Sequence, residues 1–145
     1  MSQELINALE GCLNPNTVQQ SELKLQQLSE HSDFTEQLLR LIGGLESSPL
    51  LIMALSTLKN FITERYNSKE GSIINSQKDI LKGSLFDMFY AIKNNPNAVN
   101  LYKEIIFCVI AVDFPWNGVD QQLLNDLDGR IEAGVYFCRQ VARNF

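Results

Sequence analysis

Residues 49–66 (PLLIMALSTLKNFITERY) have the pattern of one long amphipathic helix with two different stripes. At 100° per residue, one face carries four apolar side chains at i, i+4, i+7 and i+11: Leu51, Leu55, Leu58 and Ile62. The opposite face repeats small polar side chains at the same spacing, with Lys59 at its edge: Ser56, Asn60, Thr63 and Asn67. A helix that only closes a core does not need such a polar stripe. The segment therefore predicts a helix that lines a binding surface.

The helical period runs through nearly the whole chain, which predicts the all-α fold class. Besides residues 49–66, we expect helices at about residues 3–13, 17–30, 34–45, 76–93, 98–113, 119–127 and 130–145. The Asn-Pro breaks at 14–16 and 94–97 separate helices because proline lacks an N–H and asparagine caps well. Further start signals are Asp33, the segment 47–49 (SSP) and a capping pair of Ser76 and Asp79. The run 105–112 is apolar nearly all round, which predicts a helix buried between neighbours.

These eight helices form four antiparallel pairs that begin near residues 3, 34, 77 and 119. The spacing is close to the period of about 40–47 residues typical of HEAT and armadillo solenoids, and it also fits a compact helical bundle. The last helix carries two apolar stripes: 131, 135, 138, 142 and 145, and 133, 137 and 141. Because a capping repeat needs a polar outer side, we expect residues 1–145 to be one α-α superhelical region of a longer solenoid.

Composition excludes several classes of function. A net charge of −5 argues against generic nucleic-acid binding, which needs clustered Lys and Arg. Three separated cysteines in apolar helical patterns indicate reduced thiols, and a single histidine makes a metal site improbable. No phosphate loop, nucleophile–base pair, signal peptide or membrane-length apolar run is present in the sequence. We therefore expect no cofactor, no membrane span and no enzymatic activity.

Four short motifs occur in order along the chain: 21–25 (SELKL), 33–39 (DFTEQLL), 58–62 (LKNFI) and 113–116 (DFPW). Together they resemble the N-terminal region of the importin-β (karyopherin) family, with the closest likeness to the importin-7 and importin-8 type or the cellular-apoptosis-susceptibility exportin type. Ser21 stands where the family usually has alanine, and Trp116 follows Pro115 directly where the family inserts residues. The family carries cargo through nuclear pores, so the resemblance implies a transport receptor that shuttles between nucleus and cytoplasm.

The resemblance also implies a partner and a site. In the family, the second helix of each repeat lines the concave surface, and the first repeats embrace the GTP-bound Ran GTPase. Lys59 and Asn60 match the family's Leu-Lys-Asn element, Glu22 matches its Ala-Glu element, and Ser56 and Thr63 share the face on the helical wheel. Cargo and nuclear-pore proteins are expected to bind through other repeats.

Structural explanations compete with several of these assignments. Lys59 and Asn60 also fit a solvated helix face, and Glu22 also fits an ordinary surface carboxylate. For Asp113 we favour neutralisation or capping of a neighbouring helix end, and for residues 114–116 a packed corner between repeats. A HEAT or armadillo scaffold that holds a peptide or helix, unrelated to transport, is the alternative function.

Overall fold

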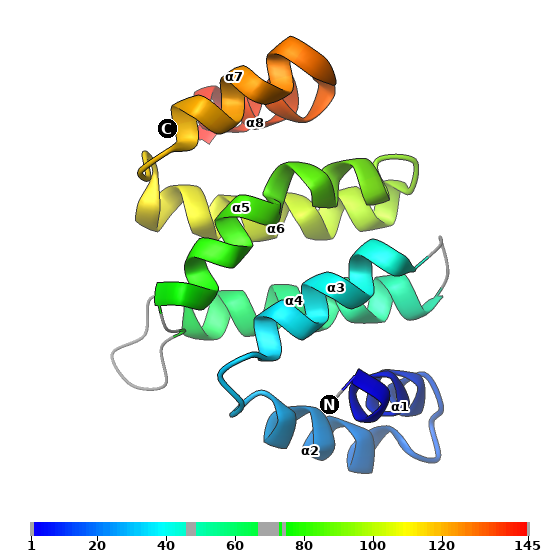
Figure 1. The fold of residues 1–145 in the computed structure, drawn as a ribbon. Coiled ribbons are helices and arrows are strands. Elements are labelled where there is room, and N and C mark those ends of the chain that lie inside the picture. The colour runs from blue at the N-terminus through cyan, green and yellow to red at the C-terminus, as the bar shows by residue number, and fades with distance from the viewer. Residues whose placement is uncertain (1, 46–48, 67–72, 74, 145) are drawn as a thin grey trace.

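The computed structural model describes residues 2–45, 49–66, 73 and 75–144, which form eight α-helices and no strand. The helices follow one another as stacked pairs from the N-terminus to the C-terminus (Figure 1). Their bounds are α1 (Ser2–Cys12), α2 (Val18–Leu28), α3 (Phe34–Gly44), α4 (Pro49–Arg65), α5 (Asn75–Ile92), α6 (Pro96–Asp113), α7 (Val119–Gly129) and α8 (Glu132–Asn144). The predicted all-α class and the stacked pairs of a HEAT-like α-α solenoid are confirmed.

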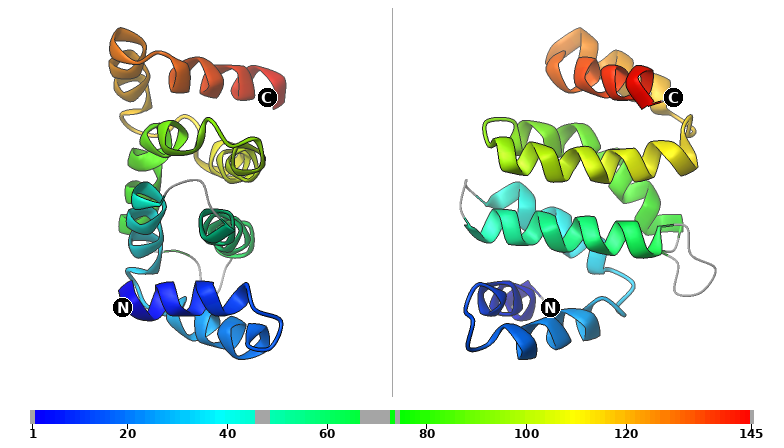
Figure 2. Two further views of the ribbon diagram at one scale, coloured as in Figure 1. Left: turned by 90° about the vertical axis from the view of Figure 1, so that its right-hand side faces the viewer. Right: turned by 180° about the vertical axis from the view of Figure 1, so that it is seen from behind.

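The second to fourth pairs form two layers. Helices α3, α5 and α7 lie in one layer and α4, α6 and α8 in the other (Figure 2, left). Within the layers α3 packs on α5, and α6 packs on both α4 and α8. The first pair is placed differently. Helix α1 packs against both α2 and α4. In Figure 2 (left), α1 is seen from the side, whereas α3 and α4 are seen end-on. Helix α1 therefore crosses the end of the stack.

The apolar stripe of α4 lies in the centre of the core, as the sequence predicted. Leu51, Leu55, Leu58 and Ile62 are each at most 1% exposed. Burial of one such side chain contributes about 1.5–3 kcal/mol. The predicted stripe of α5 is buried as well: Leu81, Leu85, Met88 and Ile92. The two stripes hold the second and third pairs together.

The helix starts agree less closely with the expected caps. Asn95 caps α6, accepting hydrogen bonds from the backbone N–H groups of Asn97 and Ala98, with Pro96 as the first helical residue. Asp33 occupies the N-cap position of α3, but its side chain makes no capping hydrogen bond. Helix α5 begins at Asn75, so the expectation that Ser76 is its cap was wrong. The expected cap at 47–48, like Asn67 of the polar stripe, lies outside the described residues.

Two expectations for the C-terminal half were also wrong. Helix α6 is not buried all round, since Phe107 and Val112 are 47% and 41% exposed. The cause is its position in the layer of α4 and α8, where only one side of the helix faces α5. Helix α7 continues to Gly129 and α8 begins at Glu132, so Ile131 lies between them with a φ of 69°. Ile131 is thus 51% exposed and is not part of a helical stripe.

The remaining stripes of α8 divide as expected. Ala133 and Phe137 are fully buried, whereas Cys138 and Ala142 are exposed and Val135 is half-buried. Leu124 and Leu127 of α7 are also exposed, at 61% and 40%. The last pair therefore retains apolar surface beyond its contacts with α5 and α6.

Asp113 at the end of α6 joins three helical segments. Its carboxylate accepts a hydrogen bond from the Tyr66 hydroxyl and pairs with Lys82 Nζ of α5 at 3.3 Å. Burial opposes its ionisation, but the bonds from Tyr66 and Lys82 outweigh burial and lower the pKa of Asp113. Asp113 therefore has a structural role, although it binds side chains and not the helix end that we expected.

The segment after Asp113 forms the expected packed corner. The Phe114–Pro115 peptide bond is cis, and the indole of Trp116 packs edge-on against Phe137 with ring centroids 5.7 Å apart. Trp116 Nε1 donates to Gln122 Oε1 at 2.7 Å. The Trp116 ring is thereby fixed between the third and fourth pairs.

Among the described helices, none combines the length and apolar character that crossing a membrane requires.

Candidate protein-binding surface

A groove of about 390 Å³ runs between α2 and α4 and brings together three of the predicted site residues. Glu22 of α2 and Ser56 and Asn60 of α4 all line it. Its apolar lining comes from α2, α3 and α4: Val18, Leu25, Phe34, Met53 and Phe61. Phe34 and Phe61 pack edge to face with centroids 5.0 Å apart, which gives the groove a rigid aromatic wall. We name this feature the α2–α4 groove.

The α2–α4 groove is acidic. Arg65 is the one cationic residue of the described chain that lines it, and its Nη2 atom forms an ion pair with Glu30 Oε1 at 3.0 Å. The Arg65 guanidinium lies 5.3 Å from the centre of the Phe61 ring. Within the described part of the chain, the lining carboxylates Glu22 and Glu64 form no ion pair. The groove therefore offers two unneutralised carboxylates beside an apolar wall, which suits a partner with basic side chains.

Cys12 lies beside Glu22 in the lining of the same groove. Burial raises the pKa of the Cys12 thiol, and the Glu22 carboxylate raises it further. The thiol therefore stays protonated and is a poor nucleophile, so this cysteine contributes packing and not chemistry.

Ser56 and Asn60 have side chains available to a partner. Among the described residues, neither the Ser56 hydroxyl nor the Asn60 amide makes a side-chain hydrogen bond. The Thr63 hydroxyl, in contrast, donates to the Asn60 carbonyl at 3.0 Å. Ser56 and Asn60 therefore offer hydrogen-bonding groups to the groove that the fold does not already use.

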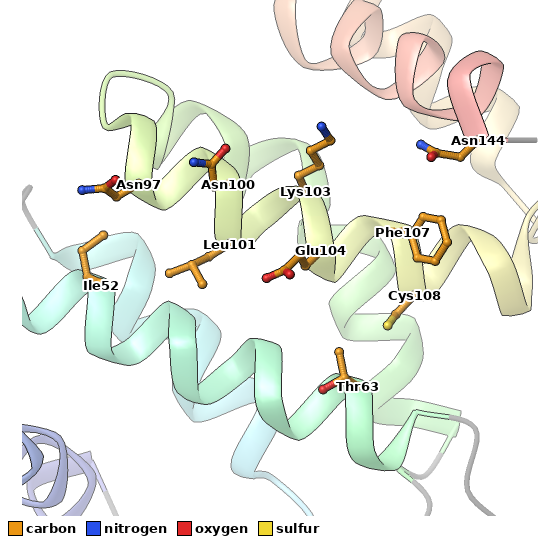
Figure 3. Close-up of a pocket in the computed structure, with 10 residues that line it drawn as sticks. All are labelled: Ile52, Thr63, Asn97, Asn100, Leu101, Lys103, Glu104, Phe107, Cys108 and Asn144. Atoms are coloured by element: carbon orange, nitrogen blue, oxygen red, sulfur yellow. The ribbon is translucent and has the colours of Figure 1, made fainter.

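The other two predicted residues lie on the far side of α4. Thr63 lines a second groove of about 890 Å³, formed by α4, α6 and the end of α8 (Figure 3). We name it the α4–α6–α8 groove. Lys59 Nζ lies 3.8 Å from the carboxylate of Glu104, a lining residue of this second groove. The five residues thus lie on α2 and α4 but do not form a single cluster.

Sequence reasoning missed several lining residues. Gln26 and Glu64 line the α2–α4 groove one helical turn beyond Glu22 and Asn60, so their i, i+4 spacing was the available signal. The contribution of α6 and α8 to the second groove had no such signal, because it depends on how the pairs stack.

No group of three His, Cys, Asp or Glu side chains suited to a metal occurs in the described ranges.

Ser21 also has a definite role in the contact between α1 and α2. A Cβ added to Gly11 would lie 1.9 Å from Ser21 Oγ and 3.0 Å from Ser21 Cβ. The two helices therefore pack closely where Gly11 faces Ser21, and Thr17 Oγ1 donates to the Gly11 carbonyl at 2.7 Å nearby. The space that the Ser21 hydroxyl occupies is left by the missing Cβ of Gly11.

Comparison with known proteins gives one match. Residues 21–91, from within α2 to the penultimate residue of α5, match the family model described as the importin-beta N-terminal domain. No curated protein and no solved structure matches the chain. The matched segment contains the whole of α4 and all five predicted site residues. This match supports the importin-β family, a family of nuclear transport receptors and not of enzymes, for this chain.

Proposed function

We propose that this chain is the N-terminal part of a nuclear transport receptor and binds Ran in its GTP form through α2, α4 and α6, the second helices of the first three pairs. In this proposal the receptor shuttles between nucleus and cytoplasm, and cargo and nuclear-pore proteins bind repeats other than these. The single observation that carries the proposal is the α2–α4 groove, which unites Glu22, Ser56 and Asn60 within the matched segment. The importin-7, importin-8 or exportin subtype stays a prediction.

The chemistry of the groove supports a protein partner. The Phe34–Phe61 wall offers apolar contact, the Asn60 amide and Ser56 hydroxyl offer hydrogen bonds, and Glu22 offers a negative charge. A groove with unpaired carboxylates favours a partner with Lys or Arg at the interface, and opposes one with acidic residues there. Specificity would thus arise from charge and shape together.

Lys59 has a different role from Asn60 in this proposal. Its ammonium group is held near Glu104, and its side chain is 26% exposed. An exposed pair of this kind contributes about 0–1 kcal/mol, so a partner carboxylate can replace Glu104 at little cost. Lys59 therefore serves as a displaceable contact beside the α4–α6–α8 groove.

Isothermal titration calorimetry of the 145-residue chain with Ran loaded with a non-hydrolysable GTP analogue, and separately with GDP, tests the proposal. We expect binding in the micromolar range for the GTP form and none for the GDP form. The double variant Glu22→Gln, Asn60→Ala should weaken binding at least about tenfold, which is about 1.4 kcal/mol. A matched pair of changes on α7, Asp128→Asn and Asn125→Ala, should leave binding unchanged. Both double variants should melt at the temperature of the unmodified chain.

Two results would contradict the proposal. Equal heats with the GTP and GDP forms would exclude nucleotide-dependent recognition. A fall in melting temperature that parallels the fall in affinity would show that Glu22 and Asn60 are structural.

The alternative, a scaffold unrelated to transport, is favoured by the size of the α4–α6–α8 groove, which exceeds that of the α2–α4 groove. Such a scaffold would bind a peptide whether or not Ran is present. Failure of every Ran titration together with peptide binding would select it.

A further inference from the structure

The α4–α6–α8 groove differs in chemistry from the α2–α4 groove. Its apolar lining comes from α4 and α6: Ile52, Leu101, Phe107 and Cys108. Its polar lining is dominated by amides from α6 and α8: Asn97, Asn100 and Asn144. Leu101 and Glu104 point from α6 toward α4, and Asn144 approaches from α8 (Figure 3). The groove is therefore an apolar strip bordered mainly by uncharged amides, with Lys103 and Glu104 as its charged groups.

The lining residues of α6 follow one stripe along the helix. Six of them occur at 97, 100, 101, 104, 107 and 108, which is the i, i+3, i+4, i+7 pattern of a single face, and Lys103 lies at the edge of that face. At 1.5 Å per residue this stripe is about 16 Å long. An extended peptide rises about 3.3 Å per residue, so about five residues match its length.

The amides suit a peptide backbone. Each carboxamide can both donate and accept hydrogen bonds, as a peptide group does. The side chains of Asn97 and Asn100 make no side-chain hydrogen bond within the described residues. Asn144 Nδ2 donates to the Gln140 carbonyl at 3.0 Å, which leaves its Oδ1 as an acceptor. The side-chain amides of Asn97 and Asn100 and the Oδ1 atom of Asn144 are thus available to a peptide at the border of the apolar strip.

The charges of the groove determine which side chains fit. The Glu104 carboxylate is shared with Lys59, whereas Lys103 forms no ion pair in the described part of the chain. The unneutralised charge of this groove is therefore positive, in a chain whose net charge is −5. Charge complementarity favours a carboxylate on the partner, the opposite of the preference of the α2–α4 groove.

We propose that the α4–α6–α8 groove binds a short extended peptide segment of a partner protein that carries one large apolar side chain and a nearby carboxylate. The apolar side chain packs on Leu101 and Phe107, the backbone bonds the asparagine amides, and the carboxylate pairs with Lys103. This groove is distinct from the α2–α4 groove that carries the proposed Ran contact, and the chain then has two grooves of opposite charge preference.

Fluorescence anisotropy with two sets of fluorescein-labelled pentapeptides tests the proposal. Each peptide has Leu at the centre and Ser elsewhere, except that Glu is placed at each flanking position in turn; the second set has Lys in place of Glu. We expect at least one Glu peptide to bind at least about tenfold more tightly than its Lys counterpart. Lys103→Glu should reverse that preference, and Phe107→Ser should weaken both sets. Lys24→Glu makes the same charge change on α2, where the residue lines neither groove, and should have no effect.

Several results would overturn the proposal. Equal binding of the two sets, no binding of either, or indifference to Lys103→Glu would exclude the assigned charge contact. Displacement of the peptide by Ran-GTP would place both partners in one site. Concentration-dependent dimerisation that Lys103→Glu abolishes would instead assign the groove to a second copy of the chain. Because Glu22→Gln with Asn60→Ala should leave peptide binding intact, failure of this proposal and failure of the Ran proposal are distinguishable.

Discussion

The hydrogen bond between Tyr66 and Asp113 should make a measurable contribution to the free energy of unfolding. Tyr66 is only 2% exposed, and its hydroxyl donates to a carboxylate that also pairs with Lys82. A hydrogen bond to a charged group contributes about 1.5–3 kcal/mol. The lower end applies here, because the Asp113 side chain is 26% exposed and keeps Lys82 when the hydroxyl is removed. Tyr66→Phe should therefore cost about 1.5 kcal/mol.

Thermal unfolding followed by circular dichroism provides the measurement. For a domain of this size, 1.5 kcal/mol lowers the melting temperature by about 3–6 °C. Tyr136→Phe is the matched control, because this hydroxyl makes no hydrogen bond among the described residues and its removal should change stability by less than about 0.5 kcal/mol. A double-mutant cycle of Tyr66→Phe with Asp113→Asn should give a coupling of about 1–1.5 kcal/mol.

The same contact predicts a pH dependence. Because the pKa of Asp113 is lowered below its ordinary value of 3.8 in the folded chain, its contribution is complete above that value. The contribution is lost as the pH falls through the folded pKa. The coupling between Tyr66 and Asp113 should thus be present at neutral pH and should decline as the pH is lowered below 3.8. A coupling below about 0.3 kcal/mol at neutral pH, or one that does not change with pH, would refute the reasoning.

Three further predictions concern the fourth pair. Asp126→Ala should cost about 3 kcal/mol in urea unfolding, because the buried carboxylate accepts hydrogen bonds from the Gly134 N–H at 2.6 Å and the Tyr90 hydroxyl at 3.0 Å. Gln140→Leu should raise the free energy of unfolding measured in urea by about 1 kcal/mol, since it removes a buried Oε1 that has no hydrogen-bond partner in the described residues. Phe137→Ala should cost about 3–5 kcal/mol and shift Trp116 emission to longer wavelength, because the indole loses its fully buried packing partner.

The core could be predicted from sequence because it depends on local periodicity. A 3.6-residue period identifies which side of α4 and α5 is buried, and Leu55 and Leu81 are indeed fully buried. The same reasoning failed for α6, whose apolar composition suggested burial all round. Periodicity cannot tell whether a neighbouring layer covers a second face, and Phe107 of α6 is 47% exposed.

The site could be predicted only in part, for a related physical reason. The wheel placed Ser56 and Asn60 on one face of α4, and both line the α2–α4 groove. It could not separate Thr63, which lines the neighbouring groove, because the boundary between the grooves depends on where α6 packs. Nor could it find the Lys59–Glu104 pair, whose members are 45 positions apart and meet only across two stacked helices.

Chemical-shift mapping tests the central claim most directly. Uniformly ¹⁵N-labelled chain is titrated with Ran carrying a GTP analogue and, in parallel, with Ran carrying GDP, so that weak binding remains visible. We expect the GTP form to shift amide resonances of α2 and α4 around Glu22, Ser56 and Asn60. Those of α5 and α7 should stay unchanged, and the GDP form should have no effect. Shifts confined to α5 and α7, or identical shifts with both nucleotides, would contradict the proposed Ran contact.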